Sequence, residues 1–231
     1  MAGAMVLVVA GMLTGCTNYG KITDKQLTLT DYTAIDVSNG VDVEMMEGIS
    51  TPVLTADELI MEKVRVEVKD GTLFLELKDM VYNTRIKELK VKLPVNANLR
   101  RITASGASYV RVQGEVPLNE LTLSGAASAD IDRTTDMKKI VMSGLSRAEI
   151  KGTGDVVEIV ISGGSDLVAD KLLVSEINGT LSGASAVDLT VCTRLAIVAS
   201  GASMINFGLV SPTCEVQNDC ELTGGSVISQ R

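Results

Sequence analysis

The chain has 231 residues, of which 45% are hydrophobic but only 3% aromatic, and it contains no histidine and no tryptophan. Without histidine it cannot form a Ser-His-Asp triad, a Cys-His nucleophile pair, a His-Glu-x-x-His zinc site or a histidine-ligated haem. Its valines lie mostly in alternating runs, which is typical of β-structure. A net charge of −8 without any basic run excludes nucleic acid as an expected partner.

The N-terminal segment resembles a lipoprotein signal peptide. Residues 2–13 are apolar but too few to span a bilayer, and they are followed by Thr14-Gly15-Cys16, similar to a bacterial lipobox. We therefore predict a signal peptide over residues 1–15, lipidation of Cys16, and a linker over residues 16–33, with the lipid as the only membrane anchor. No Lys or Arg precedes Lys21, so the true start can lie upstream. A buried N-terminal element with an incidental cysteine is the alternative.

The sequence of residues 34–96 predicts a β-rich segment that caps one end of the fold. Residues 35–43 contain two alternating runs around Gly40, and residues 64–77 contain two more around Asp70-Gly71, a strong hairpin signal. A short helix with Asp57 as N-cap is expected before Lys63. This segment shows no regular repeat, so we expect it to cover one end of the fold that follows.

From residue 97 to residue 231 the sequence repeats. A Ser-Gly pair returns about every 19 residues, with Thr223-Gly224 as a seventh copy and a further serine usually three positions after the first. The six pairs are Ser105-Gly106, Ser124-Gly125, Ser143-Gly144, Ser162-Gly163, Ser182-Gly183 and Ser200-Gly201. Apolar residues recur one and three positions before each pair's serine and five and seven positions after it. Each repeat therefore predicts a strand, a tight corner and a second strand.

Two short strands cannot bury their apolar faces alone, but stacked copies close a common core. We therefore predict an all-β protein, a parallel β-helix-like solenoid with rungs of about 19 residues, continuous with the cap as one domain over residues 34–231. The corner serines are expected to hydrogen-bond the backbone or one another. No base accompanies any of them, so we expect their role to be structural. The absence of tryptophan fits narrow stacked rungs.

The outward positions offer one charged cluster. Asp130 and Glu149 are expected one rung apart, about 5 Å, a spacing that could suit a retaining glycosidase or a calcium site. The next outward column is predicted to hold Asp132, Lys151 and Asp170 in consecutive rungs. A solvated wall of mixed charge is the favoured interpretation, since none of the four tyrosines is placed in a repeated outward column.

Three cysteines lie near the C-terminus. Cys192 and Cys214 are expected in successive rungs and could form a disulfide, while Cys220 falls in an apolar column. A bridge between Cys214 and Cys220 is the alternative. The last corner is followed by only a few residues, so the final rung is predicted to have a free edge that supports weak self-association.

At this point the sequence resembles the bacterial auto-transporter adhesin family with a head GIN domain, common among Bacteroidetes lipoproteins. The resemblance rests on residues 37–43, the hairpin of residues 64–77, Leu93-Pro94 and the Ser-Gly-x-Ser corners, and it covers residues 34–229. It implies a β-helix-like fold and an adhesin function.

Together these features predict a non-catalytic binding or adhesion module that is lipid-anchored to the bacterial cell envelope. The outer membrane is the expected location of the anchor. Its ligand is an unknown glycan or protein, and no catalytic residue, cofactor or metal is expected. A carbohydrate-active lyase or hydrolase and a purely structural envelope component are the alternatives.

Overall fold

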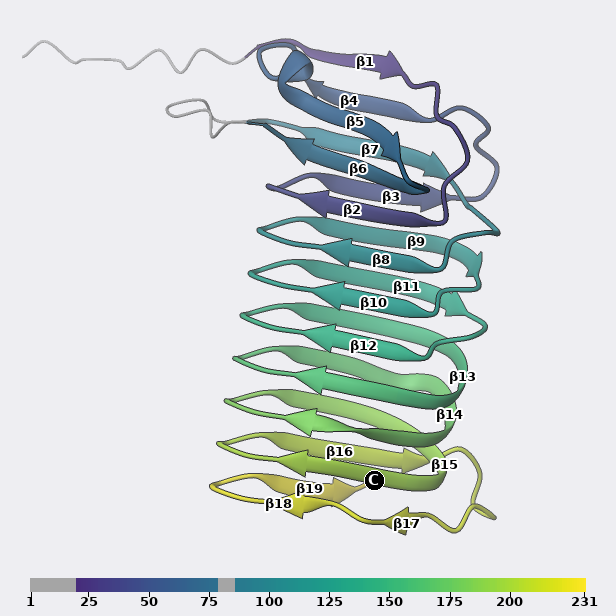
Figure 1. Cartoon of the computed structure of the whole chain (residues 1–231), viewed down its shortest axis with the longest axis vertical. Helices are drawn as coiled ribbons and strands as arrows, with labels where there is room; N and C mark the ends of the chain where they lie inside the picture. The colour runs from purple at the N-terminus through teal and green to yellow at the C-terminus, as the bar shows by residue number, and fades with distance from the viewer. Residues whose placement is uncertain (1–19, 79–85) are drawn as a thin grey trace, which may run out of the picture.

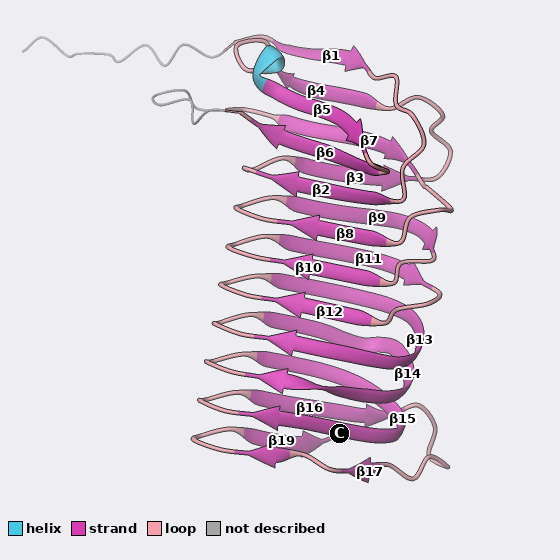
Figure 2. Ribbon diagram, viewed as in Figure 1, coloured by secondary structure: helices cyan, strands magenta, loops and turns pink. Residues whose placement is uncertain are grey.

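The protein is a β-solenoid. The computed structural model describes residues 20–78 and 86–231, and within them it contains strands and a single short 3-10 helix, η1 (Met61–Lys63) (Figures 1 and 2). Each turn of the coil, called a rung here, has one strand in each of two facing walls, and a tight corner joins them. The all-β fold and the stacked rungs predicted from the repeat are therefore confirmed.

The first-strand wall contains the strands that run toward the corners, together with β5, which is antiparallel to them. In chain order these strands are β2 (Ala34–Ser38), β5 (Val64–Lys69), β6 (Thr72–Leu77), β8 (Arg101–Ala104), β10 (Glu120–Leu123), β12 (Lys139–Met142), β17 (Gln217–Asn218) and β18 (Glu221–Leu222).

The second-strand wall contains most of the remaining strands. They are β1 (Ile22–Gln26), β3 (Asp42–Met46), β4 (Val53–Asp57), β7 (Leu89–Pro94), β9 (Tyr109–Val116), β11 (Ser128–Thr134), β16 (Met204–Leu209) and β19 (Val227–Gln230). Three long strands bend from this wall into the first-strand wall of the next rung, namely β13 (Arg147–Ile161), β14 (Asp166–Leu181) and β15 (Ala186–Ala199).

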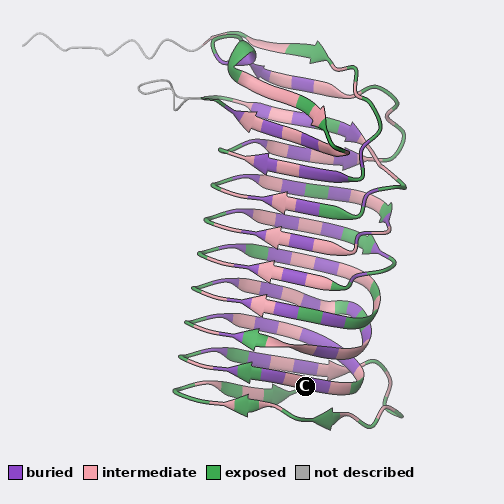
Figure 3. Cartoon of the chain, viewed as in Figure 1, coloured by how far each residue is buried: buried purple, intermediate pink, exposed green. Residues whose placement is uncertain are grey.

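The core lies between the walls and follows the predicted columns. Ile140 pairs in parallel register with Leu121 on one side and Ile159 on the other, and all three are buried. Val110, Ala129 and Ala148 form the matching column of the facing wall. Figure 3 shows the resulting alternation of buried and more exposed residues along each strand. Like side chains thus stack on like side chains, and small aliphatic residues fill the narrow coil.

The boundary expected at residue 97 does not separate two structures. β2 pairs in parallel with both β6 and β8, and β3 with both β7 and β9, so these segments are rungs of the same stack. Asn39 and Gly40 form the corner between β2 and β3 with φ values of 59° and 77°. In register, Ser38 and Asn39 lie opposite Ser105 and Gly106, so Asn39 takes the place of the corner glycine. The 19-residue spacing is lost because an insertion separates this rung from the next.

The remaining strands of the N-terminal region cap the stack, and they include β1, which lies within residues 16–33, a segment predicted to be a linker. β4 pairs antiparallel with β7 and β1 antiparallel with β4, while β5 pairs antiparallel with β6 in the predicted hairpin. The helix predicted to begin after Asp57 is wrong in extent. β4 continues through Asp57, whose Oδ1 accepts a hydrogen bond from the Leu59 N–H at 3.0 Å, and only residues 61–63 are helical. The Asp57 side chain thus stabilises a local turn and does not cap a helix at this position.

Candidate functional site

The Ser-Gly corners form a ladder along one edge of the solenoid. The corner glycines have positive φ, for example 81° at Gly144 and 79° at Gly163, a conformation that disfavours a Cβ atom. The second serines of five corners are buried, and two of these, Ser165 and Ser185, each donate to the carbonyl three residues earlier at 2.9 Å. Ser146 and Ser165 also share a hydrogen bond at 3.1 Å. Their hydroxyls thus satisfy the corner backbone, which is a structural role.

The outward column of the second-strand wall has the predicted register around Asp130. Asp130 lies beside Arg111 on one side and Glu149 on the other, and the same column continues through Asp188 and Asn206. Asn206 donates to Asp188 at 2.9 Å. The wall therefore presents hydrogen-bonding side chains at the repeat of a parallel sheet.

Tyr109 belongs to this surface, contrary to the prediction that no tyrosine lies in a repeated outward column. It pairs in register with Ser128 and with Asp42, and its hydroxyl donates a short hydrogen bond to Asp130. Burial, together with this bond to a carboxylate, raises the pKa of Tyr109 to about 12. The signal was available in the sequence, since Tyr109 stands four residues after Ser105, as Ser128 does after Ser124.

Bulges open a groove next to this column. The pairing of β11 shifts on both sides at Asp132, and the opposing segments contain Gly114 and Gly152 with φ of 143° and 135°. A β-bulge bends its strand and redirects the extra side chain. Two adjoining hollows, of about 400 and 90 Å³, share Asp132 as a lining residue. We call them together the bulge groove; its lining is Met46, Glu47, Arg111, Gln113, Gly114, Asp130, Ile131, Asp132, Arg133, Glu149 and Lys151.

Charges in the bulge groove are mixed in sign. Lys151 Nζ lies 2.9 Å from Glu149 Oε1, and the hydrogen bond and charge of Lys151 lower the pKa of Glu149. The same hydrogen bond raises the pKa of Lys151, to which the Asp132 and Asp130 carboxylates contribute. The groove can therefore offer carboxylates as acceptors and an ammonium and a guanidinium as donors to one ligand.

Asp170 does not join the predicted cluster. Lys151 lies opposite Lys171, because the pairing of β13 with β14 shifts between Glu149 and Lys151. Asp170 instead lies 4.0 Å from Arg231. The three residues lie in consecutive rungs, but the expected column of Asp132, Lys151 and Asp170 is wrong, because a bulge changes the count of residues around the bend. Over the described ranges, no group of three or more potential ligand side chains is placed to hold a metal ion.

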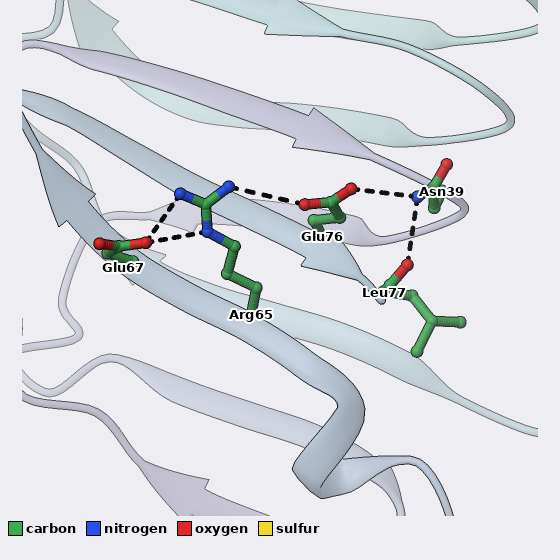
Figure 4. Close-up of polar contacts among 5 residues, drawn as sticks. All are labelled: Asn39, Arg65, Glu67, Glu76 and Leu77. Carbon is green, nitrogen blue, oxygen red and sulfur yellow. Dashed lines mark hydrogen bonds and ion pairs between the residues drawn. The ribbon is translucent and has the colours of Figure 1, made fainter. Parts of the chain in front are cut away.

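A second polar cluster lies on the first-strand wall near the cap. Arg65 contacts Glu67 at 2.7 Å and Glu76 at 3.6 Å, while Asn39 donates to the backbone carbonyl of Leu77 at 3.1 Å (Figure 4). The Arg65 guanidinium also lies 4.6 Å from the centre of the Phe74 ring. These groups bind one another, so the cluster ties the hairpin to the β2–β3 corner.

Asp36 lies next to this cluster, opposite Phe74 in the neighbouring strand. Burial is the main cause that raises the pKa of Asp36, and the Glu76 carboxylate adds to it, while Arg65 acts in the opposite direction. The ionised form of Asp36 therefore lowers the stability of this wall. We do not assign Asp36 to a ligand site.

Cys192 and Cys214 are joined by a disulfide, with Cα atoms 5.1 Å apart. It ties the middle of β15 to the segment between β16 and β17. Cys220 is free and half-buried, and burial raises the pKa of its thiol. The pairing of Cys214 with Cys220 is not the one in the structure. Cys16, the predicted lipidation site, lies outside the described residues.

Comparison of the sequence with known protein families identifies the family of this chain. The model of the family described as "Putative auto-transporter adhesin, head GIN domain" matches residues 31–208. The chain belongs to this family. Its members are named as adhesins, which supports a binding role and indicates an extracellular or surface-exposed protein. No curated protein matches the chain.

Solved structures share the fold at low identity. A "putative adhesin" from Bacteroides fragilis NCTC 9343 is 18% identical with a TM-score of 0.79, covering 91% of this chain and 97% of that chain. A "putative adhesin" from Parabacteroides merdae ATCC 43184 is 18% identical with a TM-score of 0.67, covering 92% and 97%. A "putative lipid binding protein" from Parabacteroides distasonis ATCC 8503 is 16% identical with a TM-score of 0.68, covering 92% and 97%. No helix in the described segments has the length and apolar character needed to cross a bilayer.

Proposed function

We propose that this protein is a non-catalytic adhesion module whose bulge groove binds a hydroxyl-rich ligand, a glycan on another cell or on a matrix. The observation that carries the proposal is the groove itself, in which acceptors and donors are held on a rigid wall by register and bulges. Asp130 is fixed by Tyr109, and Glu149 by Lys151. Charged groups fixed in this way lose little conformational freedom when they bind sugar hydroxyls.

The same geometry disfavours the alternative of a carbohydrate-active enzyme. A glycosidase needs one carboxyl with a raised pKa to protonate the leaving group. Lys151 lowers the pKa of Glu149 instead. Asp130, the neighbouring carboxylate, accepts a hydrogen bond from the Tyr109 hydroxyl and is held in place as an acceptor.

Binding can be tested on an array of glycans and matrix proteins. Asp132→Ala removes a carboxylate that both hollows share and that takes part in no hydrogen bond or close ion pair in the described structure. We expect affinity for the captured glycan to fall about tenfold, the value of one charged hydrogen bond. Asp188→Ala is the matched control, because Asp188 lies on the same wall outside the groove. Equal loss in both variants would place the site elsewhere on the wall, and binding to nothing would favour a purely structural envelope component.

Lipidation of Cys16 is part of this proposal, since an adhesion module must be held at the envelope. Metabolic labelling of the expressed protein with an alkyne palmitate analogue should label the wild type and leave Cys16→Ala unlabelled. A wild type that partitions into the soluble fraction without label would contradict the anchor.

A further inference from the structure

A further hollow lies beside the cap, and we call it the cap hollow. It is lined by residues 27–32, 50–52 and 94–98, and its volume is about 480 Å³. These residues belong to the ends of β1, β3 and β7 or to the connections that follow them, and Figure 1 shows all three connections on the edge of the stack opposite to the Ser-Gly corners. The volume lies within the range of about 300–1,000 Å³ that is typical of sites for small ligands.

The lining of the cap hollow is uncharged apart from one carboxylate. Leu29, Pro52 and Val95 supply partly buried apolar surface. Asp31 is the single charged side chain among the described residues of the lining. The other polar side chains are hydroxyls and amides, namely those of Thr28, Thr30, Tyr32, Ser50, Thr51, Asn96 and Asn98. An uncharged ligand that carries both hydrogen-bonding groups and small apolar groups fits this lining, whereas the Asp31 carboxylate repels an anion.

Several polar groups of the cap hollow are available to a ligand. Within the described chain, the backbone N–H groups of residues 28–31 donate no hydrogen bond. The N–H of Asn98 donates to Asn96 Oδ1 at 2.8 Å, while the exposed side chain of Asn98 has no hydrogen-bond partner among the described residues. Asn96 is fixed in turn, because its Nδ2 donates to Tyr32 O at 2.8 Å. Groups held in place in this way lose little conformational freedom when a ligand binds.

The cap hollow adjoins the bulge groove. Val95, which lines the cap hollow, donates its N–H to the carbonyl of Met46, which lines the groove, at 3.2 Å. A Cβ built on Gly114 of the groove would lie 2.9 Å from Val95 Cγ2, so the two residues are in contact. The loop after β3 also lines both, with Glu47 in the groove and Ser50 in the cap hollow. The two therefore lie next to each other, with Val95 between them.

We propose that the cap hollow and the bulge groove form one elongated site for a linear oligosaccharide, with an uncharged N-acetylated sugar in the cap hollow. This inference rests on the proposed function and names the class of glycan. An acetamido group has an N–H donor and a carbonyl acceptor that suit the side-chain amide of Asn98. Its methyl group can pack on Pro52 or Val95, which removes apolar surface from water.

Isothermal titration calorimetry with β1→4-linked N-acetylglucosamine oligomers of two to six sugars tests the proposal. We expect one hexamer to bind per chain, about tenfold more tightly than the dimer, because only the longer oligomer reaches both hollows. Cellohexaose is the matched ligand control, since it has the same linkage and length but a hydroxyl in place of each acetamido group. It should bind roughly three- to tenfold more weakly than the N-acetylglucosamine hexamer, through loss of hydrogen bonds and methyl contact.

Variants test each part of the elongated site. Asn98→Ala in the cap hollow should weaken binding of the hexamer roughly three- to tenfold, as Asp132→Ala in the bulge groove should. Thr51→Trp fills the cap hollow and should remove the advantage of the hexamer over the dimer. Asn178→Ala is the matched control and should bind as the wild type does, because Asn178 is an amide on the first-strand wall, opposite Glu158. Circular dichroism and thermal melting verify that the variants fold as the wild type does.

Failure of this proposal can be told apart from failure of the proposed function. If Asp132→Ala weakens binding of the hexamer while Asn98→Ala and Thr51→Trp do not, the bulge groove alone is the glycan site and the elongated site is overturned. Two hexamers per chain, equal affinity for cellohexaose, or no binding of any N-acetylglucosamine oligomer would overturn it as well. The proposed function fails only when no glycan on the array binds in a manner that depends on Asp132.

Discussion

Replacing a corner glycine by alanine tests how closely the rungs stack. Gly144 has φ of +81°, and a Cβ built there would lie 2.5 Å from the carbonyl oxygen of Gly125. That oxygen also accepts the Leu145 N–H at 2.7 Å, so it cannot move without loss of a hydrogen bond. Left-handed backbone costs a non-glycine residue about 1 to 2 kcal/mol. Overpacking of the corner adds about 1 to 3 kcal/mol, so Gly144→Ala should destabilise the protein by about 2 to 5 kcal/mol.

Gly40 provides the matched control. Its φ of +77° is nearly the same, but nothing lies within 4 Å of a Cβ built on it. Gly40→Ala should therefore cost only the backbone contribution, about 1 to 2 kcal/mol. In a chain of this size the corresponding falls in Tm are about 2 to 8 °C for Gly40→Ala and about 4 to 20 °C for Gly144→Ala. Differential scanning calorimetry of both variants measures the difference. Equal falls in Tm would refute the close contact between successive corners.

Three further predictions follow from the walls and the disulfide. Ile159→Ala should lower the free energy of unfolding by about 2 to 5 kcal/mol, while Val160→Ala on the outer face should cost under about 1 kcal/mol; similar losses in urea titrations would contradict the assigned faces. Replacing both Cys192 and Cys214 by Ala should cost about 3 kcal/mol, and peptide mapping of the non-reduced protein should recover these two cysteines joined. Because the folded state raises the pKa of Asp36, its ionised form costs stability above the ordinary carboxyl pKa. Asp36→Asn should thus have the higher Tm at pH 7, with the gap closing as the pH falls through the acid range, and a gap that widens instead would reverse the sign.

The repeat made most of the fold predictable. A column such as Leu121, Ile140 and Ile159 sits at constant spacing from the Ser-Gly corner, and the structure keeps that spacing as parallel register. Local sequence fixes such columns because a one-residue slip would expose the whole set. The alternation also predicted that Asp130 and Glu149 would be neighbours on the outer wall.

Features outside the strict period could not be predicted in the same way. The rung formed by β2 and β3 has Asn39-Gly40 at its corner and is separated from β8 by an insertion that packs above it, so its place in the stack depends on tertiary pairing. The bulge groove depends on local shifts in strand pairing at Asp132. Counting residues from the corner serine does not reveal such shifts. A further shift, between Glu149 and Lys151 in the pairing of β13 with β14, places Lys171 opposite Lys151, where the count of residues predicts Asp170.

We propose that the bulge groove binds a glycan without altering it. The most direct test is to incubate the protein with a glycan that it captures on the array, recover that glycan, and compare its mass spectrum with that of untreated material. We expect saturable binding that Asp132→Ala weakens and recovery of an intact glycan. Shortened chains or unsaturated ends produced by the wild type and not by Asp132→Ala would show catalysis in the groove and contradict it.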